Sequence, residues 1–358
     1  MTEVAHKSRI EWIDAMRGFT MILVVAFHVC QQAFAVDIKQ SASLPFLVLF
    51  RMPLFFFISG FVAYKSSITW TAHEYTTLLA KKARVQLIPT LVFFLVAVVI
   101  LAPNRMGDYI MTDLHTPTGF YWFTIALFYM LAAYYTYCFI ISRLTKRIGL
   151  AICILWILSV AMYETVYLPK IFDYAFGNPH AKEGFLIDSK IIQFMQYFQF
   201  FLYGNIVRRY WEKAQQLFDN KYVILTIIGI AFFSCIDFLK LHLLSGQWTN
   251  LSRTLAMYSM LTIVFLFFRY YKDSVTKQTK LGNILQYIGT RTLDIYLLHK
   301  LFMPNLHCIG EFFNNNHHNF VAETTLSIML ALIIIAFCIL VSNTLRMSPF
   351  LKKYLFGR

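Results

Sequence analysis

The chain has 358 residues, of which 58% are hydrophobic and only 14% charged, and its mean hydropathy is +0.58. Soluble domains carry roughly 25% charged residues, so a water-soluble fold of this composition would lack the polar side chains needed to cover its surface. The formal net charge is +14. In a soluble protein that charge would point to nucleic acid, but in a membrane protein it is typical of basic cytoplasmic loops. We therefore expect an all-α polytopic membrane protein with no nucleic-acid partner.

The cysteines give no sign of a disulfide framework or a metal cluster. Six are present, none forms a Cys-x-x-Cys pair, and most lie inside apolar runs. Zinc sites and disulfide-rich domains show short, regular spacings instead. We expect no metal cofactor.

Ten apolar stretches are candidate membrane spans, because a bilayer core needs about 20 apolar residues per helix. They cover roughly residues 13–36, 44–64, 85–101, 120–141, 149–168, 191–207, 222–241, 251–269, 284–303 and 322–345. The third and sixth stretches are the shortest. The connecting segments are short and no internal repeat is visible, so residues 1–358 are predicted to form a single membrane domain without an appended soluble domain.

The distribution of Lys and Arg predicts the orientation of these spans. With the N-terminus inside, 21 basic residues fall in inner segments and seven in outer segments, which favours ten spans with both termini cytoplasmic. A competing interpretation of the first span is a cleavable signal peptide, since a basic start and an apolar run end at Ala33-Phe34-Ala35. The polar residues inside this run favour a permanent span.

Three ionisable residues share one face of the first span. Arg17 and His28 are eleven residues apart, which at about 100° per residue leaves them only about 20° apart around a helix. Asp14 lies within about 60° of both on the same wheel. An ionisable side chain at bilayer depth costs roughly 2.5–3.5 kcal/mol, so each is a candidate for function. An imidazole, with an ordinary pKa near 6.5, can both accept and donate protons near neutrality.

Structural interpretations of the same three residues stay open. His28 could be a buried histidine whose nitrogens are satisfied by a backbone carbonyl or a neighbouring hydroxyl. Arg17 could extend to lipid headgroups at the interface, and Asp14 could serve only to pair with Arg17 at the i, i+3 spacing.

Further polar residues are predicted to gather in the outer half of the membrane. The span directions place Arg51, Asp237, Asp294 and His299 in or near that half together with His28. They could line a cavity that binds the substrate. For each of them an intramembrane ion pair is an equally good interpretation.

The inner side has a different character, because Lys81, Lys82 and Arg84 immediately precede the third predicted span. Together with Arg17 they could bind an anionic nucleotide, since basic side chains suit phosphate recognition. An ordinary basic flank of a membrane span is the alternative interpretation.

Four segments together resemble the integral-membrane acyltransferases of acyltransferase family three. They are residues 9–18 (RIEWIDAMRG, followed by His28), 52–60 (MPLFFFISG), 120–123 (FYWF) and 292–299 (TLDIYLLH). Within this family the chain looks most like the fucose acetylase-like branch of surface-polysaccharide O-acetyltransferases. The likeness extends over nearly the whole chain. Ahead of the third span the family often has two arginines three apart, where this chain has Lys81 and Arg84.

The resemblance implies a cytoplasmic acetyl-CoA or other acyl-CoA donor and a carbohydrate hydroxyl as acceptor, either at the outer face or on a lipid-linked glycan. His28 would be the general base or a transient acyl carrier. Arg17 would hold the donor, and Asp14 would orient Arg17. The resemblance also implies the cell membrane of a bacterium as location.

The resemblance gives four more residues an expected role. Ser59 and Gly60 should allow close approach of the second span to the first, and the Ser59 hydroxyl could also line the tunnel for the donor. Trp122 and Tyr296 could stack on a sugar, unless they belong to the aromatic belt at the membrane interface. A polysaccharide or small-molecule exporter without acyl chemistry is the alternative from another class, because exporters also carry ionisable residues in their spans.

Overall fold

The structure, a computed structural model, describes residues 10–114, 119, 121–167, 189–241, 249–316 and 318–356. Every regular element in these ranges is a helix. The α-helices are α1 (Glu11–His28), α2 (Leu44–Ala63), α3 (Ala72–Leu101), α4 (Met106–Leu114), α5 (Trp122–Leu144), α6 (Ile148–Met162), α9 (Ile191–Arg209), α10 (Trp211–Asp219), α11 (Lys221–Ile236), α12 (Thr249–Tyr270), α13 (Lys280–Thr290), α14 (Thr292–Leu298), α15 (His307–Asn316), α16 (Phe320–Met347) and α17 (Pro349–Phe356). Short π segments are η1 (Val29–Ala33), η2 (Tyr163–Tyr167) and η3 (Asp237–Leu241), and short 3-10 segments are η5 (Lys272–Val275) and η6 (His299–Phe302).

Eight helical segments in the described ranges are long and apolar enough to cross a membrane. The prediction of an all-α polytopic membrane protein is therefore confirmed. Two of the ten predicted spans, the sixth and the ninth, are not among the eight. The sixth contains buried polar side chains, and the ninth is not one continuous helix.

The sixth predicted span corresponds to α9, which carries a stripe of buried amides. Gln193, Gln196 and Gln199 follow one another at intervals of three residues, with only 3%, 8% and 0% of their surfaces exposed. Asn205 continues the buried polar set and donates to the carbonyl of Gly60. These amides lower the hydropathy of a helix that is nevertheless among the most buried of the fold.

The ninth predicted span is broken into α13, α14 and η6. Arg291 joins the first two pieces with φ −109° and ψ 12°, outside the helical region. Interrupted helices at membrane depth are tolerated where protein surrounds the freed backbone groups. Six of the seven residues of α14 are indeed buried.

The third predicted span is longer than its apolar stretch indicated. Helix α3 begins at Ala72, where the Thr71 side chain caps it by accepting a hydrogen bond from the Glu74 amide at 3.2 Å. Lys81, Lys82 and Arg84 therefore lie on the helix itself rather than on a loop before it.

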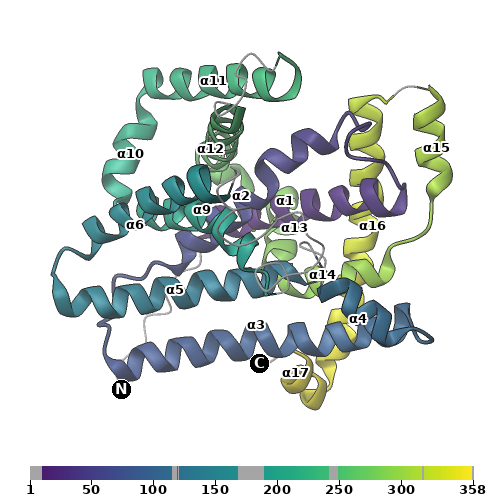
Figure 1. The fold of residues 1–358 in the computed structure, drawn as a ribbon, viewed down its shortest axis with the longest axis horizontal. Helices are drawn as coiled ribbons and strands as arrows, with labels where there is room; N and C mark the ends of the chain where they lie inside the picture. The colour runs from purple at the N-terminus through teal and green to yellow at the C-terminus, as the bar shows by residue number, and fades with distance from the viewer. Residues whose placement is uncertain are drawn as a thin grey trace.

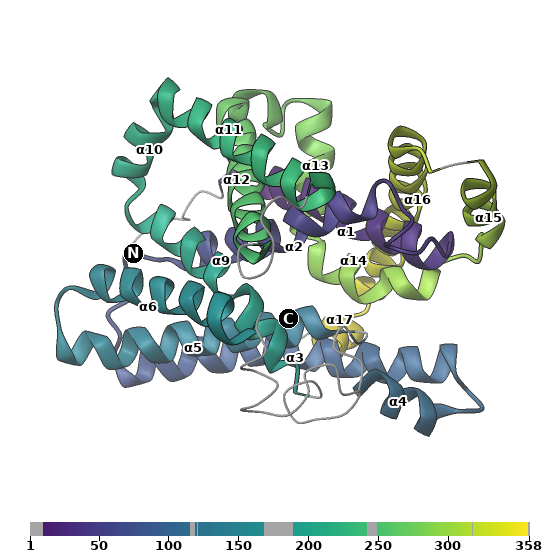
Figure 2. The same cartoon turned by 45° about the horizontal axis from the view of Figure 1, so that its top comes forward.

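Helices α1 and α2 lie at the centre of the molecule (Figure 1). Helix α1 packs most extensively against α13 and α2 against α9. Helices α3 and α5 lie side by side in a neighbouring layer that also contains α6 (Figures 1 and 2).

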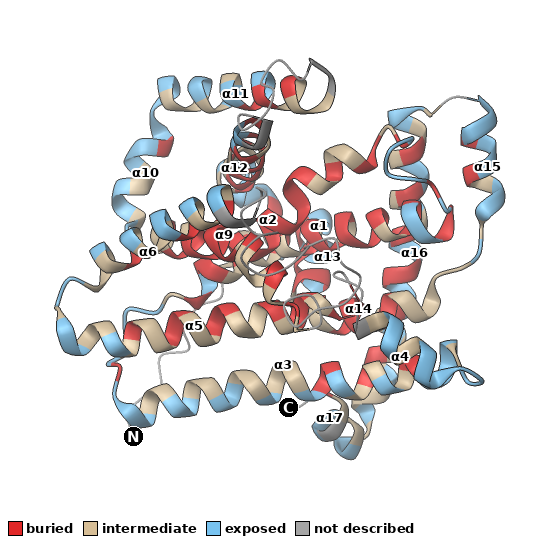
Figure 3. Ribbon diagram, viewed as in Figure 1, coloured by how far each residue is buried: buried red, intermediate tan, exposed pale blue. Residues whose placement is uncertain are grey.

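Burial is concentrated on the central helices (Figure 3). In the most apolar stretch of 18 residues in the span that contains α1, 78% of the residues are buried. The corresponding share is only 17% in the span of α11 and 28% in α3. Exposed apolar side chains such as Leu91, Leu95 and Val99 on α3 would be costly in water but are suited to contact with lipid chains.

Two glycine pairs allow the central helices to touch. A Cβ added to Gly18 would lie 1.9 Å from the Leu285 carbonyl oxygen, and one added to Gly289 would lie 1.8 Å from that of Asp14, so α1 and α13 meet backbone to backbone. Gly60 and Gly204 do the same for α2 and α9. The expectation that Gly60 serves the contact with the first span is wrong: the backbone of Phe201 on α9 occupies that position. Small residues commonly provide such contacts in membranes.

Candidate active site

Two cavities of similar size border α1, and we name them after the residue of α1 that each contains. The His28 cavity has a volume of about 320 Å³, and its lining includes His28, Arg51, Trp122, Tyr197, Tyr296 and Lys300. The Arg17 cavity has a volume of about 280 Å³, and its lining includes Arg17, Ser59, Lys65, Lys81, Lys82 and Gln86. On the predicted orientation the Arg17 cavity belongs to the cytoplasmic side and the His28 cavity to the outer side.

His28 is the last residue of α1, and the chain continues directly into the π segment η1. Such segments are frequent at functional sites, and here η1 brings Gln31 and Gln32 to the same cavity. The Nδ1 atom of His28 is buried and has no hydrogen-bond partner among the described residues. The ring is only partly buried, so its Nε2 side is the part that the cavity can reach.

A second histidine lies against the first. The rings of His28 and His299 are 5.2 Å apart between centroids. His299 is fully buried, and its Nδ1 lies 2.8 Å from the Tyr296 carbonyl oxygen and 3.1 Å from that of Ile295. Because carbonyl oxygens only accept hydrogen bonds, Nδ1 of His299 carries the proton. The Nε2 atom of His299 is left as an acceptor with no partner in the described part of the chain.

Arg51 projects into the His28 cavity from α2. Its guanidinium carbon lies 3.3 Å from the centroid of the Phe27 ring, which it covers as a cation–π pair. Only 9% of its surface is exposed. Within the described ranges no carboxylate forms an ion pair with it, and its buried Nε has no hydrogen-bond partner.

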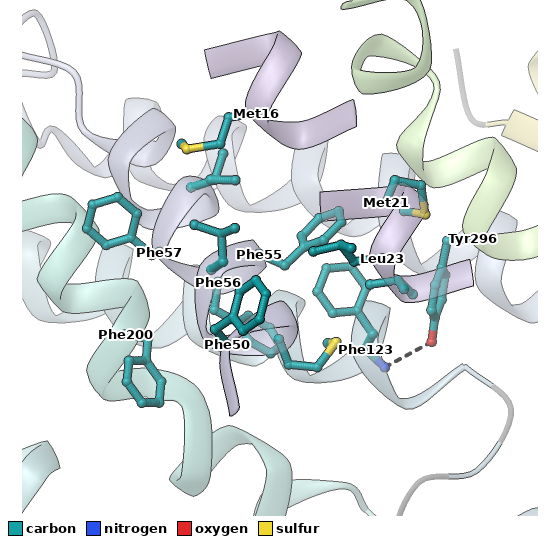
Figure 4. Close-up of a cluster of buried hydrophobic side chains, with 14 of the residues drawn as sticks. Met16, Met21, Leu23, Phe50, Phe55, Phe56, Phe57, Phe123, Phe200 and Tyr296 are labelled. Atoms are coloured by element: carbon teal, nitrogen blue, oxygen red, sulfur yellow. Dashed lines mark hydrogen bonds between the residues drawn. The ribbon is translucent and has the colours of Figure 1, made fainter. Parts of the chain in front are cut away.

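Aromatic rings form one wall of the same cavity. Trp122 stacks on Tyr197 with centroids 5.7 Å apart and planes at 27°, and Tyr197 stacks in turn on Phe56 at 5.1 Å. The Tyr296 hydroxyl accepts a hydrogen bond from the Phe123 amide at 3.2 Å, a contact drawn in Figure 4. Aromatic faces with fixed orientation suit the apolar face of a sugar ring as well as they suit a plain hydrophobic core.

The Arg17 cavity is lined by both basic and apolar side chains. Arg17 donates to the Thr292 hydroxyl at 3.2 Å and lies 3.6 Å from a carboxylate oxygen of Asp14, so two helices hold its guanidinium. The Ser59 hydroxyl donates to the Phe55 carbonyl at 2.9 Å. The buried Oε1 atom of Gln86 has no hydrogen-bond partner among the described residues and is an acceptor at the cavity wall.

An aromatic and aliphatic partition separates the two cavities. Along α1, α2 and α5 the last lining residue of one cavity and the first of the other are about one helical turn apart: Arg17 and Met21, Phe55 and Ile58, Phe123 and Leu127. Four residues of helix rise only about 6 Å. Phe55 and Phe123 meet edge to face at 4.8 Å (Figure 4). These two rings therefore lie in the layer between the cavities.

Four residues predicted for the donor or acceptor site line neither cavity. Arg84 does not line either cavity. Asp237 accepts a hydrogen bond from the Ser252 hydroxyl and is absent from the lining of the His28 cavity. Asp294 is absent from that lining too, and so is His299, which contacts the His28 ring instead. The prediction that Asp237, Asp294 and His299 line the outer cavity is therefore wrong.

Asp294 forms buried ion pairs, as the alternative interpretation of this residue predicted. Its carboxylate accepts from the Arg346 guanidinium at 2.7 Å and from the Ser342 hydroxyl at 2.6 Å, and Arg291 lies 3.6 Å away. These partners come from the C-terminal end of α16, which is predicted to be cytoplasmic, and from the break before α14.

The sequence reasoning also missed residues that line the cavities. Lys300 and Tyr197 belong to the His28 cavity, and Lys65 and Gln86 to the Arg17 cavity. The Gln193, Gln196, Gln199 stripe could have pointed to the face of α9 beside Tyr197, since three amides at a helical spacing in a span need a polar neighbour. Lys300 had a weaker signal, because a lysine at a span end usually extends to the interface.

Comparison with known families decides the class of the protein. A family model described as an acyltransferase domain, that of acyltransferase family three, matches residues 10–345. The chain belongs to this acyltransferase family. The match is to the family as a whole, and the fucose acetylase-like branch stays a prediction. No match was found among curated proteins, and none among solved structures.

Proposed function

We propose that this multi-pass membrane acyltransferase moves an acetyl group, or a related acyl group, from cytoplasmic acyl-CoA to a hydroxyl of a cell-surface or lipid-linked carbohydrate. The observation that carries the proposal is the pair of cavities on α1, one basic and one containing His28, with a partition of about one helical turn between them. The resemblance to surface-polysaccharide O-acetyltransferases also supports the bacterial cell membrane as location.

The Arg17 cavity fits the donor. Arg17, Lys65, Lys81 and Lys82 supply positive charge for the phosphates of CoA, and the cavity belongs to the side predicted to be cytoplasmic. The apolar side chains of the lining suit the extended pantetheine arm, and the free Gln86 Oε1 can accept from one of its amide N–H groups. Asp14 would keep the Arg17 guanidinium in place through their 3.6 Å contact.

The His28 cavity fits the acceptor. The sugar would lie against Trp122 and Tyr197 with one hydroxyl at His28. As the hydroxyl oxygen attacks the thioester carbonyl carbon, Nε2 of His28 takes the hydroxyl proton; the carbon–sulfur bond then breaks and the proton passes to the departing CoA sulfur. A neutral His28 with its proton on Nδ1 is required. The acceptor Nε2 of His299, in the ring 5.2 Å away, would favour that tautomer through a bridging water molecule, since the two nitrogens are not hydrogen-bonded to each other.

In a second route to the same products His28 carries the acyl group. Nε2 would attack the thioester, CoA would leave, and the acylated ring would pass the group to the hydroxyl after the partition closes. Acid quenching of the enzyme with labelled acetyl-CoA alone, followed by peptide mass spectrometry, separates the routes. Label on His28 supports the carrier, and its absence at full turnover supports the general base.

Proteoliposomes test the proposed function itself. With labelled acetyl-CoA on the side of the Arg17 cavity and a glycan on the other, we expect release of free CoA that depends on the glycan, label on the glycan, and loss of both in His28→Ala. Movement of unmodified glycan without CoA release would instead support an exporter and overturn the proposal.

A further inference from the structure

The charge balance of the His28 cavity points to the chemical class of the acceptor. Among the described residues its lining contains the cations Arg51 and Lys300, the amides of Gln31, Gln32 and Gln196, and no aspartate or glutamate. Asp113 lies near enough to act on the charge of Lys300, so Arg51 is the cation on which the argument rests. Such a lining suits a ligand that brings negative charge.

Arg51 gives the strongest evidence for an anionic ligand, because its buried charge has no carboxylate partner among the described residues. Its side chain is nine-tenths buried, its guanidinium is stacked on the Phe27 ring, and no carboxylate of the described chain neutralises it. Buried charges in proteins are normally paired. Three arginines of other helices follow that rule: Arg17 lies against Asp14, and Arg291 and Arg346 lie against Asp294.

The stacking on Phe27 also fixes the plane of the guanidinium. One face of the group covers the ring at 3.3 Å, so its N–H bonds are left to point sideways, in the plane where a carboxylate or phosphate binds by two parallel hydrogen bonds. His28 immediately follows Phe27 in the chain. An anionic group held by Arg51 would therefore lie beside the imidazole rather than in a remote part of the cavity.

We propose that Arg51 binds an anionic oxygen group of the acceptor, so that the substrate is an acidic carbohydrate or a phosphate-linked one. The shared chemistry is a carboxylate or phosphate within reach of both Arg51 and the hydroxyl to be acylated. This inference rests on the proposed acceptor role of the His28 cavity, but binding measurements test it without any acyl transfer.

The experiment is calorimetric titration of the full chain in lipid nanodiscs with two matched pairs of probes. Methyl glucuronide against methyl glucoside tests a sugar carboxylate, and farnesyl phosphate against farnesol tests a linker phosphate. We expect the anion of at least one pair to bind about tenfold or more tightly than its neutral partner, since a charge-assisted hydrogen bond contributes about that much. The pair that shows the preference identifies the source of the charge.

Variants of Arg51 make the measurement specific. Arg51→Gln should abolish the preference, Arg51→Lys should keep part of it as a point charge, and Arg51→Met should not lower the unfolding temperature of the ligand-free protein, because it removes an unpaired buried charge. Arg105→Gln is the matched control, an exposed outer arginine that lines neither cavity. It should leave the preference intact.

Three results would overturn the inference. They are equal binding of both members of each pair by the wild type, a preference that survives in Arg51→Gln, and an equal loss of kcat in Arg51→Gln for glucoside and glucuronide with unchanged binding. The last result would assign Arg51 to the reacting acyl group. An anion preference without any acyl transfer would uphold the inference and reject the proposed function, so the two can fail separately.

Discussion

Arg17 and His28 lie on one helix, eleven residues apart, and line two different cavities. The rise between them is about 16 Å, and the partition of Met21, Phe55 and Phe123 begins one turn beyond Arg17. A donor bound at Arg17 therefore meets the acceptor side only where its thioester limb passes this layer. The separation suits a reaction whose two substrates come from opposite sides of a membrane.

Replacement of His28 by alanine or glutamine should stop acyl transfer and leave donor binding intact. The loss in kcat should be on the order of 10²- to 10⁴-fold, the usual worth of a general base, because the Arg17 cavity contains no part of His28. Turnover of labelled acetyl-CoA with glycan in proteoliposomes measures the rate, and gel filtration in detergent checks folding. A wild-type rate in a folded variant would remove His28 from the chemistry.

Arg17→Ala should weaken the donor more than the chemistry. Its guanidinium offers charge-assisted hydrogen bonds worth about 1.5–3 kcal/mol each, so KM for acetyl-CoA should rise roughly tenfold to a hundredfold while kcat at saturating donor falls much less. Arg17→Lys should recover part of the affinity. Arg84→Gln, outside both cavities, is the matched basic control on the side predicted to be cytoplasmic. A rate that no donor concentration restores would show that Arg17 acts on the reacting group instead.

The partition predicts opposite results for two changes at one position. Phe55→Ala removes the ring that meets Phe123 at 4.8 Å, which should let water reach the thioester and raise acceptor-independent hydrolysis of acetyl-CoA. Phe55→Trp should slow transfer by filling the layer further, with donor affinity unchanged. Release of CoA with and without glycan measures both. If neither change alters the ratio of hydrolysis to transfer, the thioester does not pass beside Phe55.

The sequence was informative wherever one helix carries the signal. Helical spacing grouped Asp14, Arg17 and His28 on α1, and the predicted membrane depth brought Arg51 and His28 to one cavity. These deductions need only the geometry of single helices and the thickness of a bilayer.

Pairings between distant helices could not be predicted in the same way. Asp294 meets Arg346 across 52 positions of sequence, and Gly60 meets α9 rather than α1. Hydropathy indicates that a helix can lie in a membrane, but it does not indicate which other helix will pack against the polar face of that helix. The buried amides of α9 even lowered the hydropathy of a helix that packs against the centre of the fold.

His299 should act on the rate through His28. Its ring is held by two backbone carbonyls with Nε2 as a free acceptor, so His299→Leu should lower kcat roughly tenfold, equivalent to about 1.4 kcal/mol, and change KM for donor and acceptor little. His299→Gln, whose amide oxygen can accept in place of Nε2, should recover part of the rate. A loss confined to acceptor KM would instead place His299 in contact with the sugar.

Asp294→Asn should reduce stability far more than catalysis. The carboxylate accepts from Arg346 and Ser342 and lies 3.6 Å from Arg291 with only 4% of its side chain exposed. Removing one partner of a buried pair leaves an uncompensated charge and costs about 3–5 kcal/mol, so the unfolding temperature in nanodiscs should fall by several degrees. Molecules that remain folded should keep their KM for the glycan, because Asp294 does not line the His28 cavity. The double variant Asp294→Asn, Arg346→Met should be more stable than Asp294→Asn alone, since it removes the stranded guanidinium. A raised glycan KM at unchanged stability would restore the substrate-contact interpretation of Asp294.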